Sequence, residues 1–287
     1  MSNSNKTVVL VTGCSKGGIG FSLCEAFASK GCIVYATARR PESLEGFTQD
    51  NIHRLTLDVT QDDSVKEVVQ TIIKQEGQID VLVNNAGVSN SSPLIDVELE
   101  EIMRIFNTNV FAAIHTAKAV IPHMAAHKRG TIVNVGSVGG IIPIPWGGVY
   151  GATKAALHSL TDTLYMECKP LHINVVLLAP GGVKSNIAAN QAPRVLLPPD
   201  SLYKDYVDSV LKRLAVSQGN SPLPTDVFAQ TTVDAVLRAG GPPRYMCLGT
   251  GSGWFRVYQW LPRGWVLDML WNWLGEGPRK AAQKKKK

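Results

Sequence analysis

Residues 7–29 read TVVLVTGCSKGGIGFSLCEAFAS, an apolar run, a glycine-rich turn and an amphipathic stretch. The run Thr7–Val11 predicts a buried strand, and Phe21–Ser29 predicts the helix that follows it. Glycines between a strand and a helix let the backbone approach a pyrophosphate, whose negative charge is favoured at the helix N-terminus. The stretch predicts a nucleotide-binding βα unit, and a plain tight turn is the simpler alternative.

The same alternation of apolar and amphipathic stretches continues along the chain, and Pro122 is expected to end or bend the longest helix. Further strands are predicted at 32–36, 52–57, 81–83, 131–135, 173–178 and 244–248, and helices at 64–75, 98–124, 149–167, 202–216 and 226–238. Such alternation predicts an α/β fold, a Rossmann-type doubly wound parallel sheet with right-handed crossovers. We place this single domain at residues 1–250, with a substrate-loop region at 186–230 and an aromatic, basic C-terminal extension at 251–287.

Composition narrows the class of protein. With 45% hydrophobic and 18% charged residues, the 287-residue chain is globular. Its five cysteines are scattered without a C-x-x-C pair, which predicts reduced thiols and no metal site. The stretch 254–287 carries eight Lys and Arg against two acids, which equals the whole net charge of +6, so nucleic-acid binding is not indicated. The polar residues 1–6 lack a signal-peptide core, and no run approaches the roughly 18 apolar residues of a membrane-spanning helix.

The second predicted strand ends in the sequence Tyr35-Ala36-Thr37-Ala38-Arg39-Arg40. In this fold that end faces the adenine ribose, where an acid would bind the 2′-hydroxyl of NAD and an arginine suits the 2′-phosphate of NADP. No acid occurs before Glu42. We therefore expect NADPH, with Arg39 as the better phosphate ligand and Lys16 as a second one; two solvated surface arginines are the alternative.

Ser137, Tyr150 and Lys154 form a candidate acid–base group. Tyr150 and Lys154 are four residues apart at the start of a predicted helix and so share one face. A free phenol has a pKa of roughly 10 and is a poor acid or base at neutral pH, but a nearby ammonium favours phenolate and lowers that pKa. Ser137, just past a strand, can hydrogen-bond a substrate oxygen on which charge builds up. A Tyr and a Lys four residues apart are common on solvated helix faces. The pair is therefore evidence for a catalytic site only if other motifs accompany it.

Several such motifs follow one another along the chain. They are Asp58-Val59, Asn84-Asn85-Ala86-Gly87, Asn107-Thr108-Asn109-Val110, Tyr150-Gly151-Ala152-Thr153-Lys154 and Pro180-Gly181. Together with the first turn and Ser137, they resemble in order and spacing the motif set of the short-chain dehydrogenase/reductase family, over residues 6–195. The resemblance implies an oxidoreductase in which NADPH gives a hydride to a carbonyl carbon and Tyr150 gives the oxygen its proton.

The resemblance also implies residue roles. Asn109, Ser137, Tyr150 and Lys154 would form the catalytic tetrad, with Lys154 also holding the nicotinamide ribose and Asn109 holding a water of the proton relay. The cofactor would lie against Gly13, Ser15, Lys16, Gly18, Ile19, Arg39, Asp58, Val59, Asn85, Tyr150, Lys154, Val183 and Ser185. Of these, Asp58 and Val59 would line the adenine, Asn85 the adenosine ribose, and Val183 and Ser185 the carboxamide.

The first turn departs from the family pattern. Four residues separate Gly13 from Gly18, one more than is usual in the family. The sequence therefore leaves open which glycine has which role, and whether Ser15 or Lys16 meets the phosphate.

The same turn contains a second motif from another class of enzyme. Gly13-Cys14-Ser15-Lys16-Gly17 is a literal G-x-S-x-G, the pattern of a lipase or esterase nucleophile. Such an enzyme would need a histidine late in the chain, and only His158 and His172 follow in that region. His158 lies inside a predicted helix, where a structural role is the commoner one, so hydrolysis is the lesser alternative.

The C-terminal extension holds five of the six tryptophans, between Trp254 and Trp273, flanked by arginines and lysines. Tryptophan with basic residues is typical of a segment that lies on a membrane or lipid-droplet surface, and a cover for the substrate pocket or a subunit interface is the alternative. The final residues 284–287 are lysines and resemble a dilysine retrieval signal, or simply bind anionic lipid. We expect the cytosolic face of the endoplasmic reticulum or lipid droplets, and otherwise the cytoplasm.

Within the family, the first turn, the stretch 180–188 and the extension are similar to the fungal 1-acyldihydroxyacetone-phosphate reductases. That similarity implies a lipid-like carbonyl substrate, the ketone of an acylated dihydroxyacetone phosphate. Steroid, retinoid, 3-ketoacyl and polyketide ketones are the alternatives. The family often forms dimers or tetramers, so a homodimer is one assembly to expect.

Overall fold

The computed structural model describes residues 6–187, 189, 197–219, 221–277 and 279–280. Its seven strands form one parallel sheet in the order β3-β2-β1-β4-β5-β6-β7. They are β1 Val8–Thr12, β2 Ile33–Ala38, β3 Ile52–Thr56, β4 Val81–Asn84, β5 Thr131–Val135, β6 Asn174–Pro180 and β7 Tyr245–Leu248. The strand order reverses at β1, so the sheet is doubly wound and the predicted fold class is confirmed.

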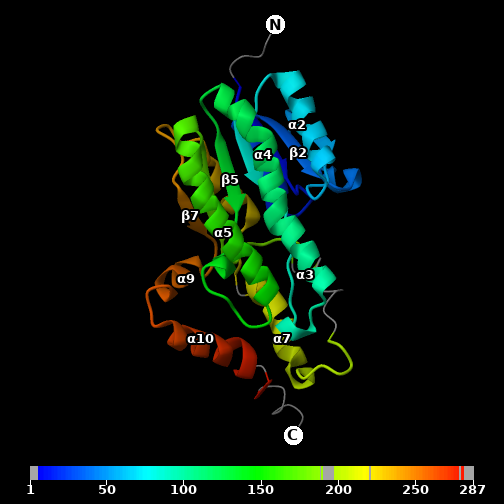
Figure 1. Ribbon diagram of the computed structural model, residues 1–287, viewed down its shortest axis with the longest axis vertical. Helices are drawn as coiled ribbons and strands as arrows, with labels where there is room; N and C mark the ends of the chain where they lie inside the picture. Colours follow the sequence, from blue (N-terminus) through cyan, green and yellow to red (C-terminus); the bar gives the residue numbers. More distant parts are fainter. Residues whose placement is uncertain (1–5, 188, 190–196, 220, 278, 281–287) are drawn as a thin grey trace.

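Helices cover both faces of this sheet (Figure 1). The fully described α-helices are α1 Ile19–Ser29, α2 Asp62–Glu76, α3 Leu99–Phe106, α4 Ala112–Ala126, α5 Gly148–Cys168, α7 Val207–Ala215, α8 Thr225–Val236, α9 Ser252–Tyr258 and α10 Arg263–Trp271. Buried side chains of α1 and α8 pack on one face, and those of α2, α4 and α5 pack on the other. The alternating residues of each β-strand serve these two cores, because successive side chains point to opposite faces.

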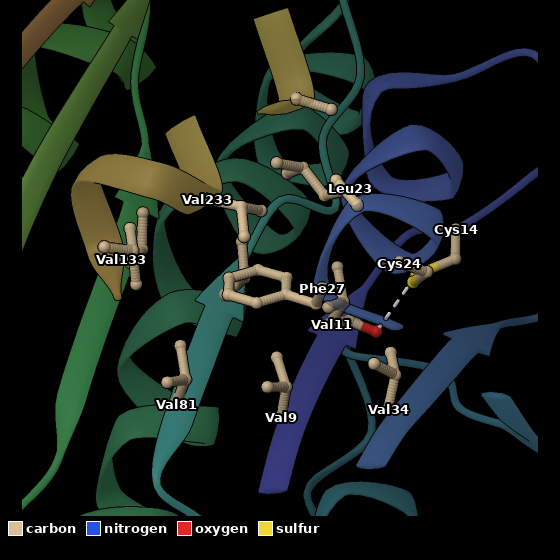
Figure 2. Close-up of a cluster of buried hydrophobic side chains, with 14 of the residues drawn as sticks. Val9, Val11, Cys14, Leu23, Cys24, Phe27, Val34, Val81, Val133 and Val233 are labelled. Atoms are coloured by element: carbon tan, nitrogen blue, oxygen red, sulfur yellow. Dashed lines mark hydrogen bonds between the residues drawn. The ribbon is translucent and has the colours of Figure 1, made fainter. Parts of the chain in front are cut away.

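The core below the first turn is shown in Figure 2. Phe27 and Leu23 of α1 are fully buried against Val9 and Val11 of β1. The thiol of Cys14 is also fully buried and donates a hydrogen bond to the Val11 carbonyl at 3.2 Å. All five cysteines are free, as predicted, so the turn is anchored by packing and not by a disulfide.

The helix predicted at 98–124 is interrupted. A π-helical turn at Asn107–Phe111 separates α3 from α4, and the chain continues in helix through Pro122 to Ala126. A π-turn adds a residue to the helical repeat and frees backbone groups, which is why such turns often occur at functional sites. The turn carries Asn109, one of the predicted catalytic residues.

The C-terminal extension folds back onto the domain. Val266 and Leu270 of α10 pack against Ile142, and the indole of Trp146 donates to the Leu274 carbonyl at 3.1 Å. The hydroxyl of Ser209, in α7, donates to the Gly275 carbonyl at 2.7 Å. We use "substrate lobe" for residues 141–147 together with α7, and α10 lies at this end of the molecule (Figure 1).

The extension exposes a group of large apolar side chains. They are Trp254, Val257, Trp260, Leu261, Trp265, Leu267, Met269 and Trp273, with polar residues such as Arg256 and Asp268 exposed between them. Trp260 and Trp265 are 83% and 75% exposed. Within the described residues no helix is both long enough and apolar enough to cross a membrane. The predicted lysine signal at 284–287 lies outside the described residues.

Candidate active site

The first turn makes a cradle that needs glycine. Gly13 has a φ of +73°, and a Cβ there would lie 2.7 Å from the Ala86 Cα. A Cβ on Gly20 would lie 2.6 Å from the Gly13 carbonyl oxygen. The turn therefore packs too closely against the chain after β4 and the start of α1 for a side chain at either position, and a nucleotide phosphate lies against such a turn in this fold.

The extra residue of the turn is Gly17. It adopts a φ of +77°, while Gly18 is the N-cap of α1 and Ile19 its first residue. The Asn186 side chain, from the stretch after β6, donates to the Lys16 carbonyl at 2.9 Å. A Cβ on Gly17 would lie 2.6 Å from this amide nitrogen, so the added glycine makes room for the contact.

The end of β2 lies beside this turn. The Ser15 hydroxyl donates to the Ser43 hydroxyl at 3.3 Å, and the Lys16 amide donates to the Ser43 carbonyl at 3.0 Å. The Arg40 guanidinium lies 4.0 Å from Glu42, whereas exposed Arg39 has no partner among the described residues. Arg39, with Lys16 nearby along this edge, is free to bind an anion.

The other predicted cofactor residues follow the carboxyl ends of the strands. The Asn85 amide donates to the Thr12 and Gly13 carbonyls at 2.9 Å each, so it braces the turn. One oxygen of Asp58 accepts from the Thr60 amide and hydroxyl, while the Val59 side chain is buried.

The stretch after β6 is held by Gln218. Its side-chain nitrogen donates to the Val183 carbonyl at 2.9 Å, and its oxygen accepts from the Ser185 amide at 3.1 Å. The Val183 amide has no hydrogen bond to any described residue. A free backbone donor at this place suits the oxygen of a carboxamide.

Tyr150 lies in the first turn of α5, where the carboxyl end of β5 brings Ser137 close. Burial raises the pKa of the Tyr150 phenol, while a hydrogen bond from Ser137 and the positive charge of Arg213 act to lower it. The sequence predicted a pKa lowered by the Lys154 ammonium, but in the structure burial outweighs the groups that oppose it and the pKa lies above its ordinary value. The phenol is therefore a protonated acid at neutral pH, ready to donate.

Lys154 is buried beneath this ring. Its ammonium donates to the Val135 carbonyl at 2.8 Å and lies 5.8 Å from the centroid of the Tyr150 ring. Burial lowers the pKa of Lys154 to about 8. The residue is therefore charged at neutral pH and can stabilise negative charge that forms on the phenol oxygen.

Asn109 is almost fully buried in the π-turn, and its side chain is occupied. Its nitrogen donates to the Val88 carbonyl and the Thr153 hydroxyl, and its oxygen accepts from the Val88 amide, all at 2.8–3.0 Å. These bonds join α5 to the chain that leaves β4. Both amide hydrogens of Asn109 are therefore used within the protein, and its role in holding a water stays a prediction.

Two residues that the sequence did not single out for this site complete it. The ring of His158 accepts a hydrogen bond from the Ser137 amide at 3.3 Å, and burial together with the Lys154 charge lowers the pKa of His158 to about 4. His158 is therefore a neutral positioning residue for Ser137. Arg213 of α7 brings a second positive charge to Tyr150. Neither has a motif; only tertiary packing shows where they lie.

The hydrolase alternative lacks its catalytic partners. The Ser15 hydroxyl bonds Ser43, and the late histidines lie elsewhere, His158 behind Ser137 and His172 at the end of a 3-10 turn before β6. A serine nucleophile needs a histidine within hydrogen-bond reach. The G-x-S-x-G pattern is here part of the phosphate turn.

A glycine cradle beside β1 and a buried Tyr–Lys–Ser group define a nucleotide-dependent oxidoreductase. The short chain dehydrogenase family model matches residues 7–195. The chain therefore belongs to the short-chain dehydrogenase/reductase family and is an NAD(P)-dependent oxidoreductase, as predicted.

The chain is similar to relatives with assigned enzyme names and to solved structures. An NADPH-dependent 1-acyldihydroxyacetone phosphate reductase of Schizosaccharomyces pombe is 36% identical, over 71% of this chain and 70% of its own. A 3-ketodihydrosphingosine reductase of Bacteroides thetaiotaomicron is 35% identical, over 73% and 75%. Among solved structures, a short-chain dehydrogenase of Streptomyces avermitilis matches with a TM-score of 0.77 at 28% identity, over 99% of this chain and all of its own.

Proposed function

We propose that this protein is an NADPH-dependent carbonyl reductase of lipid-like ketones, with 1-acyldihydroxyacetone phosphate as substrate and 1-acylglycerol 3-phosphate as product. The observation that carries the proposal is the buried Tyr150 phenol, in contact with Ser137 and placed over Lys154 at the same sheet edge as the glycine cradle. The names of the Schizosaccharomyces and Bacteroides relatives, both reductases of lipid ketones, support the substrate class.

The residues of the cradle fit NADPH. The close packing at Gly13 and Gly20 holds the turn at the N-terminus of α1, where a pyrophosphate would lie. Arg39 and Lys16 are available for the 2′-phosphate, and the Val183 amide is available for the carboxamide. Bound NADPH would supply the hydride for the carbonyl carbon.

The chain's own residues hold the proton and transfer it to the substrate. Tyr150 donates its proton to the carbonyl oxygen as that oxygen gains charge, and Ser137 orients the oxygen by a hydrogen bond. The Lys154 ammonium then stabilises the phenolate that is left. His158 and Gly139 hold Ser137 in place, the latter by donating to the serine hydroxyl at 3.1 Å.

The test is the rate of NADPH oxidation by the purified full chain with a panel of ketones. We expect the highest kcat/KM with 1-acyldihydroxyacetone phosphate, a lower value with 3-ketodihydrosphingosine, and the lowest with steroid and retinoid ketones. A steroid or retinoid as the best substrate would contradict the proposed substrate while leaving the reductase chemistry intact.

Arg39 should decide the choice between NADPH and NADH. Changing Arg39 to Ala removes a charge-assisted hydrogen bond to the 2′-phosphate, and such bonds contribute about 1.5–3 kcal/mol. We expect the KM for NADPH to rise about tenfold to a hundredfold, with the KM for NADH unchanged. Arg40→Ala is the matched control, because Arg40 faces Glu42. Equal changes for the two cofactors would contradict a phosphate contact.

We also propose that the outer side of the extension lies on a lipid surface, at the cytosolic face of the endoplasmic reticulum or on lipid droplets. Exposed Trp254 on α9, Trp265 on α10 and Trp260 in the turn between these helices support this placement, with Arg256 and Arg263 beside them for anionic headgroups. The inner side of the same extension packs on the substrate lobe. The two alternatives of the sequence, surface contact and pocket cover, thus involve opposite sides of one segment.

Substituting the two most exposed tryptophans should weaken lipid binding. Burying a large apolar side chain contributes about 1.5–3 kcal/mol, so Trp260→Ser with Trp265→Ser should lower the partition coefficient onto phosphatidylcholine–phosphatidylserine vesicles at least about a hundredfold. Met166→Ser, an exposed apolar position at the far end of α5, is the control. Unchanged co-flotation of the double variant with vesicles would contradict the proposal.

A homodimer is the assembly we propose for the domain. Apolar side chains of Phe111, Ile114 and Leu160 are 37–40% exposed on the helical face formed by the π-turn, α4 and α5. A second copy would cover them. Light scattering should give the mass of two chains, and the mass of one chain in detergent would contradict this assembly.

A further inference from the structure

Arg213 is a buried cation that has no partner among the described residues. Its side chain lies in α7 and is 8% exposed, and its Nε has no hydrogen-bond acceptor. The guanidinium makes no ion pair with any acid in the described parts of the chain. Removing a charge from water is costly unless an opposite charge receives it, so an unpaired buried guanidinium points to an anion that arrives from outside.

The guanidinium is directed at the catalytic end of α5. A Cβ placed on Gly147, the N-cap of α5, would lie 2.9 Å from the Arg213 Nε and 3.0 Å from its Nη2. Gly147 precedes Tyr150 by three residues, less than one helical turn. The electrostatic effect of Arg213 on the Tyr150 phenol agrees with this closeness.

The helix that carries Arg213 is fixed on two sides. The Ser91 hydroxyl, from the chain after β4, donates to the Val210 carbonyl at 3.0 Å. The Ser209 hydroxyl donates to the Gly275 carbonyl of the C-terminal extension. Ser209 and Val210 are themselves fully buried, so α7 cannot turn to bring Arg213 into water without breaking these contacts.

We propose that Arg213 binds an anionic group of the substrate, a phosphate ester attached close to the ketone. The inference rests on the proposed function and narrows its substrate class. Tyr150 fixes where the ketone oxygen must lie, and Arg213 lies near it. In an acylated dihydroxyacetone phosphate, one carbon and one oxygen separate the ketone carbon from phosphorus. The planar guanidinium presents two parallel N–H donors to such a group.

The same charge excludes the other ketones. A 3-keto sphingoid base carries an ammonium on the carbon next to its ketone, which would lie near Arg213 and be repelled. Steroid and retinoid ketones are uncharged there and would leave the guanidinium buried and unpaired. Arg213 therefore favours a substrate with a negative charge beside its ketone and disfavours a substrate without that charge.

The test uses two ketones that differ only in the phosphate: 1-acyldihydroxyacetone phosphate and 1-acyldihydroxyacetone with the same acyl chain. In Arg213→Met, kcat/KM for the phosphorylated ketone should fall about a hundredfold more than kcat/KM for the other ketone, because any effect on the Tyr150 phenol is common to both. Arg213→Lys should recover part of the loss. Gly147→Ala, which would displace the guanidinium while leaving its charge, should also lower the preference for phosphate and keeps the test valid if Arg213→Met fails to fold.

Equal losses on the two ketones would overturn the inference, because Arg213 would then act on the phenol or the fold, while the proposed reduction of lipid ketones would stand. If the wild-type chain reduced neither acyl ketone, the proposed substrate would fail by itself. Titration calorimetry with 1-acylglycerol 3-phosphate then decides on Arg213. Binding to the wild type that weakens about a hundredfold in Arg213→Met supports it, and equal binding overturns it.

Discussion

Replacing Tyr150 by phenylalanine should lower kcat for ketone reduction by about a thousandfold while NADPH still binds. The substitution keeps the ring over Lys154 but removes the proton that the carbonyl oxygen must receive, and positioned acids contribute about a hundredfold to ten thousandfold. Burial holds this phenol protonated, so it is in the correct state for reduction at neutral pH. The measurement is single-turnover oxidation of NADPH at saturating ketone.

The matched control for that experiment is Tyr165→Phe, on the same helix. The Tyr165 ring contacts Lys169 and Arg244 and has no place in the site, so its kcat should change by less than about twofold. NADPH affinity, measured by fluorescence titration, should be the same in both variants and the wild type. A Tyr150→Phe enzyme that kept more than a tenth of its kcat would show that another group donates the proton.

Changing Lys154 to methionine should lower kcat/KM about a hundredfold to a thousandfold at pH 7, since removing one preorganised electrostatic donor has effects of this size. The same residue should set the alkaline limit of the wild-type enzyme. Burial lowers the pKa of Lys154 to about 8, so the ammonium is charged below that pH and neutral above it. Reduction should therefore be constant below pH 8 and fall toward tenfold per pH unit above it.

The pH profile distinguishes an effect of the Lys154 charge from a structural effect of substituting Lys154. Lys154→Met should show no decline near pH 8, because it lacks the buried ammonium whose deprotonation causes that decline. Lys154→Arg keeps a positive charge throughout this range, so whatever activity it retains should persist above pH 8. Lys118→Met, an exposed lysine on α4, should keep the wild-type profile. A wild-type profile that stays flat to pH 10 would contradict a role for the Lys154 charge.

Much of the fold could be predicted because its signals are local. Each buried strand is a short apolar run, each surface helix shows its period, and the turn at 12–20 needs glycine for reasons visible in the sequence. The positions of Ser137 and Tyr150 follow from the same alternation of strands and helices. Ser137 comes just after the end of β5, and Tyr150 lies in the first turn of the next helix, α5, beside that strand end. Once the parallel sheet is predicted, Ser137 and Tyr150 are therefore expected to lie close together.

The remainder of the site depends on contacts between distant segments. Arg213 lies in an amphipathic stretch beside Lys212, and nothing local shows that one is buried and the other exposed. The π-turn at Asn109 interrupts a stretch whose helical period is continuous. The direction of the Tyr150 pKa shift was mispredicted for the same reason: the sequence showed the lysine four residues away, but not the burial of the phenol, which raises the pKa, or Arg213 of α7, which acts to lower it.

The contacts from Trp146 to Leu274 and from Ser209 to Gly275 have a practical consequence for anyone who prepares this protein. Truncating the chain before Trp254, to obtain a sample that aggregates less, would remove the hydrogen-bond acceptor of the buried Trp146 indole. It would also expose Ile142 to solvent. We expect such a truncated sample to lose both the proposed lipid binding and the proposed turnover, so the loss of one could be mistaken for the cause of the other. Both are therefore best measured on the full-length chain.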